Sequence, residues 1–171
     1  MLTRHASVPA TVDRRILQTY LGDHLTGAAG GRARARKMSE WYADREIGPA
    51  LADFARELDE EHRHLGELID ALDLRRGLPL QALARVGELL GRAKTNGRVL
   101  TGSPMTPLLE LELLRAAVNA KQGLWEVLVE YSDELGLDAA DYVRLAAQAE
   151  RQQSMLERLH AEVRPEALRP G

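Results

Sequence analysis

The sequence has no cysteine, few aromatic residues and no long apolar run. Without cysteine, the chain cannot form disulfides, thiolate metal sites or iron–sulfur clusters, and it has no cysteine nucleophile. No apolar stretch approaches the roughly 18 residues that a membrane-spanning helix needs. Residues 1–12 also lack the apolar segment of a secretory signal peptide, so we expect a cytoplasmic protein that does not enter a membrane.

Neither sign of charge dominates the sequence, which has 23 Lys and Arg against 26 Asp and Glu and a net charge of −3. This balance gives no electrostatic reason to expect binding to nucleic acid or to an anionic membrane. The basic run at 32–37 has no aromatic residues between its cations. We interpret it as a solvated helix face, because sites for single-stranded nucleic acid combine such cations with aromatic platforms.

Ala, Leu, Arg and Glu are abundant in this 171-residue chain, a composition typical of one all-helical domain. Apolar residues recur with a period of 3.6 along four long segments, and cap residues and prolines mark their ends. We predict long helices over 13–43, 49–74, from a start within 101–107 to 135, and 138–164. A short helix at 79–92 and a turn at 94–98 are expected between the second and the third.

Short loops make neighbouring helices antiparallel, and they pair the four long helices into two hairpins. A connection of roughly thirty residues joins the hairpins, which is how a ferritin-like bundle is connected. We therefore predict an all-α, ferritin-like four-helix bundle over 13–164, with a long crossover that contains a short extra helix. Residues 1–12 and 165–171 are expected to be a flexible N-terminal tail and a C-terminal tail.

Each long helix has one polar residue in the middle of its apolar face: His24, Glu61, Lys121 and Gln152. A buried carboxylate is costly unless a cation or hydrogen-bond donors compensate it. We predict that Lys121 pairs with Glu61 and that His24 and Gln152 complete the hydrogen bonds. This metal-free polar centre would fill the place where ferritin-like proteins hold metal, and it would repel a divalent cation.

The alternative is a di-iron or di-manganese site. Ferritin-like bundles that bind two metals use two glutamates and two Glu-x-x-His pairs, whose spacing puts both side chains on one helix face. Glu61 and His64 form one such pair. Further candidate ligands are Asp23, Glu112 and Glu150. Gln153 stands where the second histidine belongs, so the sequence departs from the paired pattern.

Small residues are concentrated near the predicted centre: Gly27, Ala28, Gly31 and Ala117. A glycine inside a helix costs about 0.5–1 kcal/mol relative to alanine and usually indicates that a neighbour packs close to the backbone. The same residues could instead leave space for a small ligand. We expect surface positions for His62, His64 and His160, and packing roles at helix ends or seams for Trp41, Trp125, Tyr131 and Tyr142.

Several stretches resemble a bacterial family of uncharacterised ferritin-like proteins. They are Tyr20-Leu21-Gly22-Asp23-His24-Leu25-Thr26-Gly27-Ala28, Asn96-Gly97-Arg98, Ser103-Pro104, Leu109-Glu110-Leu111-Glu112 and Gly123-Leu124-Trp125 with Lys121 ahead of it. The resemblance covers about residues 14–160 and implies a ferritin-like four-helix bundle, with no activity attached to it.

Three functions are compatible with these patterns. The first is a non-enzymatic bundle without a cofactor, acting by self-association, as a homodimer, or by binding a partner. The second is a di-metal oxidoreductase or metal carrier that uses Asp23, Glu61, His64, Glu112 and Glu150. The third is a binder of a small ligand beside Gly27 and Gly31.

Overall fold

The computed structural model describes residues 8–75 and 103–169, and these residues form helices and turns without a strand. The helices are α1 (Arg14–Trp41), α2 (Gly48–Ala71), α4 (Met105–Glu130), α5 (Ser132–Leu135) and α6 (Ala139–Val163). The all-α prediction is confirmed. None of these helices is long and apolar enough to cross a membrane.

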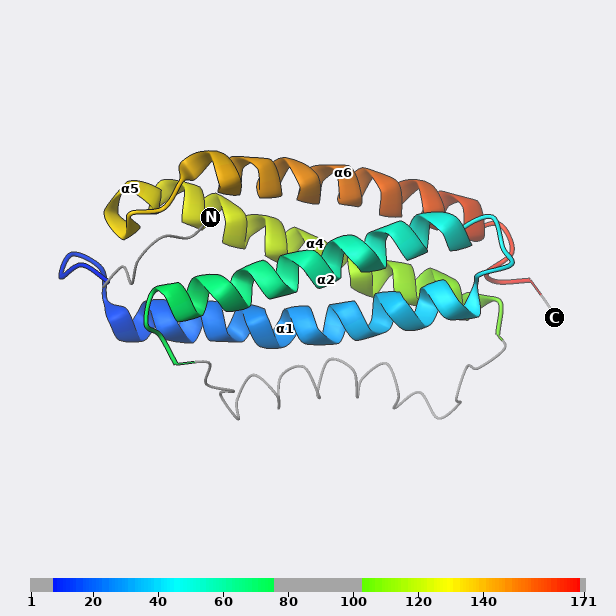
Figure 1. The fold of residues 1–171 in the computed structure, drawn as a ribbon. Helices are drawn as coiled ribbons and strands as arrows, with labels where there is room; N and C mark the ends of the chain where they lie inside the picture. Colours follow the sequence, from blue (N-terminus) through cyan, green and yellow to red (C-terminus); the bar gives the residue numbers. More distant parts are fainter. Residues whose placement is uncertain (1–7, 76–102, 170–171) are drawn as a thin grey trace.

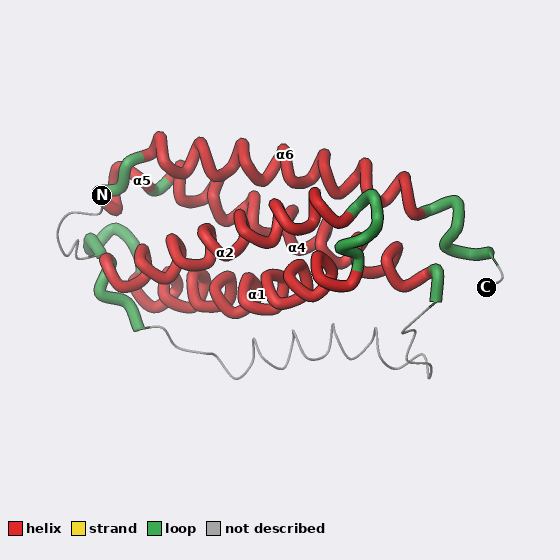
Figure 2. Tube along the Cα trace, turned by 45° about the vertical axis from the view of Figure 1, so that its right-hand side comes forward, coloured by secondary structure: helices red, strands yellow, loops and turns green. Residues whose placement is uncertain are grey.

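The four long helices lie side by side as a bundle (Figures 1 and 2). α1 packs along α2, α4 packs along α6, and α1 also contacts α4. α2 and α4 run in the same direction, so the chain leaves α2 at one end of the bundle and enters α4 at the other (Figure 1). A ferritin-like bundle needs this arrangement, but the ferritin-like assignment itself stays a prediction.

Two local features define the first hairpin. The Asp13 carboxylate accepts hydrogen bonds from the backbone N–H groups of Arg15 and Ile16 at 2.8 and 3.1 Å, which caps the start of α1. At the start of α2, a Cβ on Gly48 would collide with the carbonyl oxygens of Tyr42 and Ala43. The turn between the helices therefore requires glycine at this position.

α2 ends at Ala71, three residues earlier than predicted. Asp73 adopts a positive φ of 53°, which takes the backbone out of the helix. The N–H of Leu74 then bonds to the carbonyl of Ile69 at 3.0 Å. Leu72 and Leu74 are nevertheless buried. The apolar periodicity of the sequence therefore continues past the end of the helix, which explains why the helix was predicted to extend to residue 74.

The prediction of one uninterrupted helix from the 101–107 region to Leu135 is wrong. α4 ends at Glu130, and the separate turn α5 follows. The Ser132 hydroxyl donates to the Val129 carbonyl at 2.8 Å, a side-chain bond that competes with the helical pattern. Gly136, with φ 64°, ends α5, and Asp138 caps α6 through the N–H of Ala140 at 3.0 Å, as predicted.

The apolar stripes of the four long helices meet in one core. Its largest fully buried side chains include Leu21, Met38, Leu51, Phe54, Leu65, Leu68, Leu111, Leu114, Trp125 and Tyr142. Trp41 and Tyr131, which lie at helix ends, are exposed. The predicted short helix at 79–92, the turn at 94–98 and the resemblance at 96–98 lie outside the described residues.

Candidate functional site

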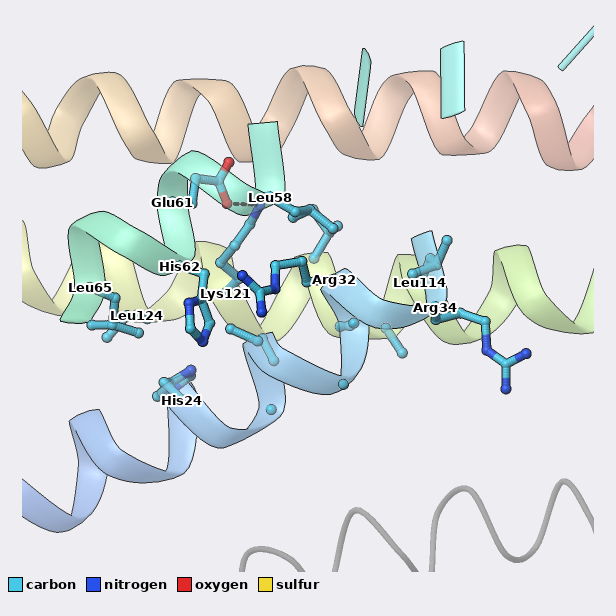
Figure 3. Close-up of a pocket in the computed structure, with 18 of the residues that line it drawn as sticks. His24, Arg32, Arg34, Leu58, Glu61, His62, Leu65, Leu114, Lys121 and Leu124 are labelled. Atoms are coloured by element: carbon cyan, nitrogen blue, oxygen red, sulfur yellow. Dashed lines mark hydrogen bonds and ion pairs between the residues drawn. The ribbon is translucent and has the colours of Figure 1, made fainter. Parts of the chain in front are cut away.

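The centre of the bundle contains a buried ion pair between two helices. The Lys121 ammonium on α4 donates to Glu61 Oε2 on α2 and to Gln152 Oε1 on α6. Figure 3 shows the Lys121–Glu61 contact as a dashed line. Only 12% of the Lys121 side chain and 4% of the Glu61 side chain are exposed. One ammonium therefore joins three helices from inside.

Two glutamines complete the hydrogen bonds of the Glu61 carboxylate. Gln152 Nε2 and Gln148 Nε2 donate to Glu61 Oε1 at 2.8 and 3.1 Å. Gln152 Nε2 also lies 2.7 Å from Glu57 Oε2. Glu57 and Gln148 were not predicted as members of this network, although each lies four residues, one helical turn, before Glu61 or Gln152 on the same helix face.

The charge of Lys121 is opposed by its burial. Desolvation is the largest effect and lowers the pKa of Lys121, whereas the nearby Glu61 carboxylate acts in the other direction. Removing Glu61 would thus leave an ammonium with little water around it, and removing Lys121 would leave a carboxylate in the same position. Either single loss is costly, because a buried charge needs its partner.

His24 is not among the hydrogen-bond partners of this network in the described part of the chain. It lies on α1, where its ring meets the Tyr20 ring edge-on at a centroid distance of 4.7 Å. Burial lowers the pKa of His24, and the charge of Asp23 partly opposes this shift. The structure thus brings Glu61, Lys121 and Gln152 together and places His24 elsewhere, beside a pocket described below.

The candidate metal ligands do not converge. Within residues 8–75 and 103–169, no group of three or more His, Asp and Glu side chains could hold a metal ion. Glu112 instead lies 3.3 Å from His160 Nε2, far along α6 from Glu150. The donor set Asp23, Glu61, His64, Glu112 and Glu150 therefore does not fit a di-iron or di-manganese centre.

His64 lies in a cluster of rings, not on the surface as predicted. Its ring centroid is 6.3 Å from that of Trp125 and 5.8 Å from that of Tyr142. In the described part of the chain, His64 Nε2 and Trp125 Nε1 are buried and lack a hydrogen-bond partner. Desolvation lowers the pKa of His64, so the neutral imidazole is favoured.

A second buried charge lies on α4. Glu110 Oε1 is 2.6 Å from Arg34 Nη1, and Glu110 Oε2 accepts a hydrogen bond from the Tyr42 hydroxyl at 3.2 Å. Burial and the Glu110 charge raise the pKa of Tyr42 to about 12. Arg34 was expected on a solvated face, and Glu110 was not predicted as its partner. The signal was present, since Glu110 and Lys121 both interrupt apolar runs of the same helix.

A pocket of about 410 Å³ lies beside the polar centre, between α1, α2 and α4 (Figure 3). We call it the α1–α2–α4 pocket. Its apolar lining includes Phe54, Leu58, Leu65, Leu113, Leu114, Val118, Leu124 and Trp125, and its small residues include Gly27, Ala28, Gly30, Gly31, Ala116, Ala117 and Ala120. The Lys121–Glu61 pair forms part of its wall.

Other charged and polar side chains line the same pocket: Asp23, His24, Arg32, Arg34 and His62. In Figure 3, Arg32, His24 and His62 lie on the same side of the pocket, whereas the end of Arg34 points away from it. Arg32 Nε is 3.4 Å from Asp59 Oδ1, and Arg36 is 2.7 Å from the other oxygen of that carboxylate. The Asp59 carboxylate is thus the counter-ion of both Arg32 and Arg36.

Comparisons of the chain with family models, with curated proteins and with solved structures gave no match. The resemblance to ferritin-like proteins therefore stays a prediction.

Proposed function

We propose that this chain is a non-enzymatic binding protein that holds a small, largely apolar molecule in the α1–α2–α4 pocket. A volume of about 410 Å³ lies within the range of small-ligand sites, about 300–1,000 Å³. The lining is mostly aliphatic and aromatic with a few polar groups, the composition that such sites share.

The observation that carries this proposal is the surroundings of two glycines in α1. A Cβ built on Gly27 meets no atom within 4 Å, and one built on Gly31 meets only Ala117 Cβ, at 4.0 Å. No neighbour packs close enough to require glycine, contrary to the expectation from sequence. Each glycine still costs the helix about 0.5–1 kcal/mol relative to alanine. Keeping space open in the pocket accounts for residues that otherwise only weaken α1.

The Lys121–Glu61 pair forms a polar part of the pocket wall. It supplies a neutralised polar wall to an otherwise apolar pocket, and its ammonium repels divalent cations from the centre of the bundle. We therefore propose a metal-free centre on a ferritin-like scaffold. The helix directions described above support that scaffold.

Binding of a neutral fluorescent dye such as Nile red tests the proposal. We expect saturable binding to the intact chain and a loss of affinity of at least about tenfold in Ala117→Leu, because the larger side chain occupies the pocket. Ala33→Leu is the matched control, since Ala33 is exposed on α1 and does not line the pocket. Equal dye binding by all three proteins, or by none of them, would contradict the proposed function.

Self-association is a second candidate, supported by apolar side chains at one end of the bundle. Ile16 at the start of α1 is 69% exposed, and Val143 near the start of α6 is 53% exposed. Both helices begin at the same end (Figure 1). Sedimentation velocity tests a homodimer formed through this end. We expect Ile16→Lys with Val143→Lys to give the monomer, and an unchanged sedimentation coefficient would exclude this interface.

A further inference from the structure

We infer that the α1–α2–α4 pocket takes an amphiphile with an apolar body and a carboxylate head, and that Arg32 binds the head. This inference rests on the proposed function and adds the chemical class of the ligand. It follows from the distribution of charge around the pocket, from the contacts of Arg32 and from the apolar residues of the lining.

Most of the charged groups at the pocket already have opposite charges beside them. Lys121 contacts Glu61, and Arg34 lies 2.6 Å from Glu110. These two cations therefore contribute little net field to a ligand. The remaining charged groups of the lining are Arg32 and Asp23, so the position of a charged head depends on these two side chains.

Arg32 shares its counter-ion, Asp59, with a second arginine. Its 3.4 Å contact with Asp59 lacks hydrogen-bond geometry, and Asp59 Oδ1 has no hydrogen-bond partner among the described residues. Arg36 holds the other oxygen of Asp59 with a 2.7 Å hydrogen bond. Asp59 is shared by two guanidinium groups and cannot neutralise both of them. A guanidinium has parallel N–H donors that match the two oxygens of a carboxylate.

A negative charge on the same helix bears on where the head binds. Asp23 precedes Arg32 by nine positions along α1, a separation of about 13 Å in a helix. A carboxylate head would be repelled near Asp23 and attracted near Arg32. The apolar body then lies against the aliphatic lining of the pocket, which includes Leu65 and Leu124.

A matched set of ten-carbon ligands tests the inference: decanoate, 1-decanol and decyltrimethylammonium. Their binding is measured by calorimetry and by tryptophan fluorescence in a Trp41→Phe background. The chain has two tryptophans, so Trp125 in the pocket lining is then the only reporter. We expect decanoate to bind about tenfold more tightly than decanol, the effect of one charge-assisted contact, and the cation to bind most weakly.

Arg32→Gln and Arg36→Gln separate the pocket cation from its neighbour. Both variants remove one partner of Asp59, but only Arg32 lines the pocket. We expect Arg32→Gln to abolish the preference for decanoate over decanol, whereas Arg36→Gln keeps the preference. Circular dichroism checks that both variants remain folded.

Two results would overturn the inference, and each is distinct from failure of the proposed function. Equal affinity for decanoate and decanol would show a pocket without a head-group site, and a preference for decanoate that survives Arg32→Gln would place the head elsewhere. In both cases the pocket still binds a ligand. If none of the three ligands and no neutral dye binds, the proposed function itself fails.

Discussion

The amide nitrogen of Gln152 lies 2.8 Å from Glu61 Oε1, so a hydrogen bond between two buried side chains joins α6 to α2. The Gln152 amide oxygen accepts from the Lys121 ammonium, which also contacts Glu61. Acid, amide and ammonium thus form a closed triangle across three helices. Loss of one member leaves the other two buried without a full set of partners.

We predict that Lys121→Met lowers the free energy of unfolding by about 3 kcal/mol, because Glu61 keeps its charge and loses its counter-ion. Adding Glu61→Gln should recover part of this loss, which gives a coupling energy of at least about 1 kcal/mol between the two sites. Urea denaturation of the intact chain, the two single variants and the double variant measures this coupling energy. Arg56→Met, on the exposed surface of α2, is the control and should change stability by less than about 0.5 kcal/mol. Additive effects of the two substitutions would contradict the pairing.

Gly27→Ala and Gly31→Ala should each stabilise the chain by about 0.5–1 kcal/mol, because alanine favours the helix and the added methyl group meets open space or an ordinary contact. The same variants should bind a pocket dye less tightly, since they reduce its volume. Chemical denaturation and dye titration measure the two effects. Destabilisation would mean that a neighbour packs close enough to require glycine. Gly48→Ala is the comparison for such a loss of stability, because a Cβ at Gly48 would collide with two backbone carbonyl oxygens.

His64→Phe should stabilise the chain by about 1 kcal/mol at pH 7.5, because it removes a buried nitrogen without a partner and keeps a ring against Trp125 and Tyr142. The effect is measured as a change in the urea midpoint. A loss of stability at this pH would indicate that the His64 ring makes a hydrogen bond that matters for the fold.

The advantage of His64→Phe should grow in acid. The pKa of His64 is lowered from 6.5 in the folded chain, so the unfolded chain binds more protons below pH 6.5. Stability is therefore lost as pH falls from 6.5 through the lowered pKa. Desolvation causes the shift, the charges of Asp141 and Glu67 oppose it, and those of Arg144 and Arg63 add to it. His24 has a lowered pKa as well, and comparing the two proteins cancels its contribution. A pH-independent difference would contradict the prediction.

Tyr42→Phe should cost about 1 kcal/mol, the value of its hydrogen bond to Glu110. In the intact chain, the pKa of Tyr42 is raised to about 12. Unfolded tyrosine ionises near 10, so this contribution is complete below pH 10 and is lost as pH rises from 10 to 12. Absorbance at 295 nm should show one tyrosine fewer titrating near 12 in the variant. Tyr142, whose pKa is also raised to about 12, remains as the internal reference.

Manganese(II) or iron(II) should leave the unfolding midpoint unchanged, because the candidate ligands do not converge and an ammonium occupies the centre. A ligand that binds only the folded state raises stability with its concentration, so a thermal scan with and without millimolar metal is a direct measurement. A metal-dependent rise in the midpoint would support the di-metal alternative.

The all-helical class and the Lys121–Glu61 contact could be predicted because both depend on periodicity. Glu61 and Lys121 each occupy a position of an apolar stripe, so both face the core of the bundle. A buried charge is costly without a partner, and pairing the two opposite charges removes most of that cost. The stop at Gly136 and the cap at Asp138 were visible for a similar reason, since each residue type has one favoured place at a helix end.

Other features depend on how far each helix is rotated and how closely pairs of helices approach. The burial of His64 and the pairing of Arg34 with Glu110 arise where a polar residue at the edge of one stripe meets the edge of another. The pocket arises where α1 and α4 place small residues opposite each other. The pattern of one helix can indicate that Glu110 faces the core, but it does not show which side chain of a neighbouring helix meets it, and Arg34 and His64 were therefore expected on the surface.

The shared direction of α2 and α4 sets a minimum length for the chain between them. Retracing a helix of 26 residues, as in α4, covers about 39 Å. A fully extended backbone needs about twelve residues for that path, and residues 72–104, which join α2 to α4, provide 33. Deletions that leave fewer than about twelve residues cannot return the chain to the start of α4. Such a protein would have to reverse its second hairpin, which would separate Lys121 from Glu61 and produce a different molecule from nearly the same sequence.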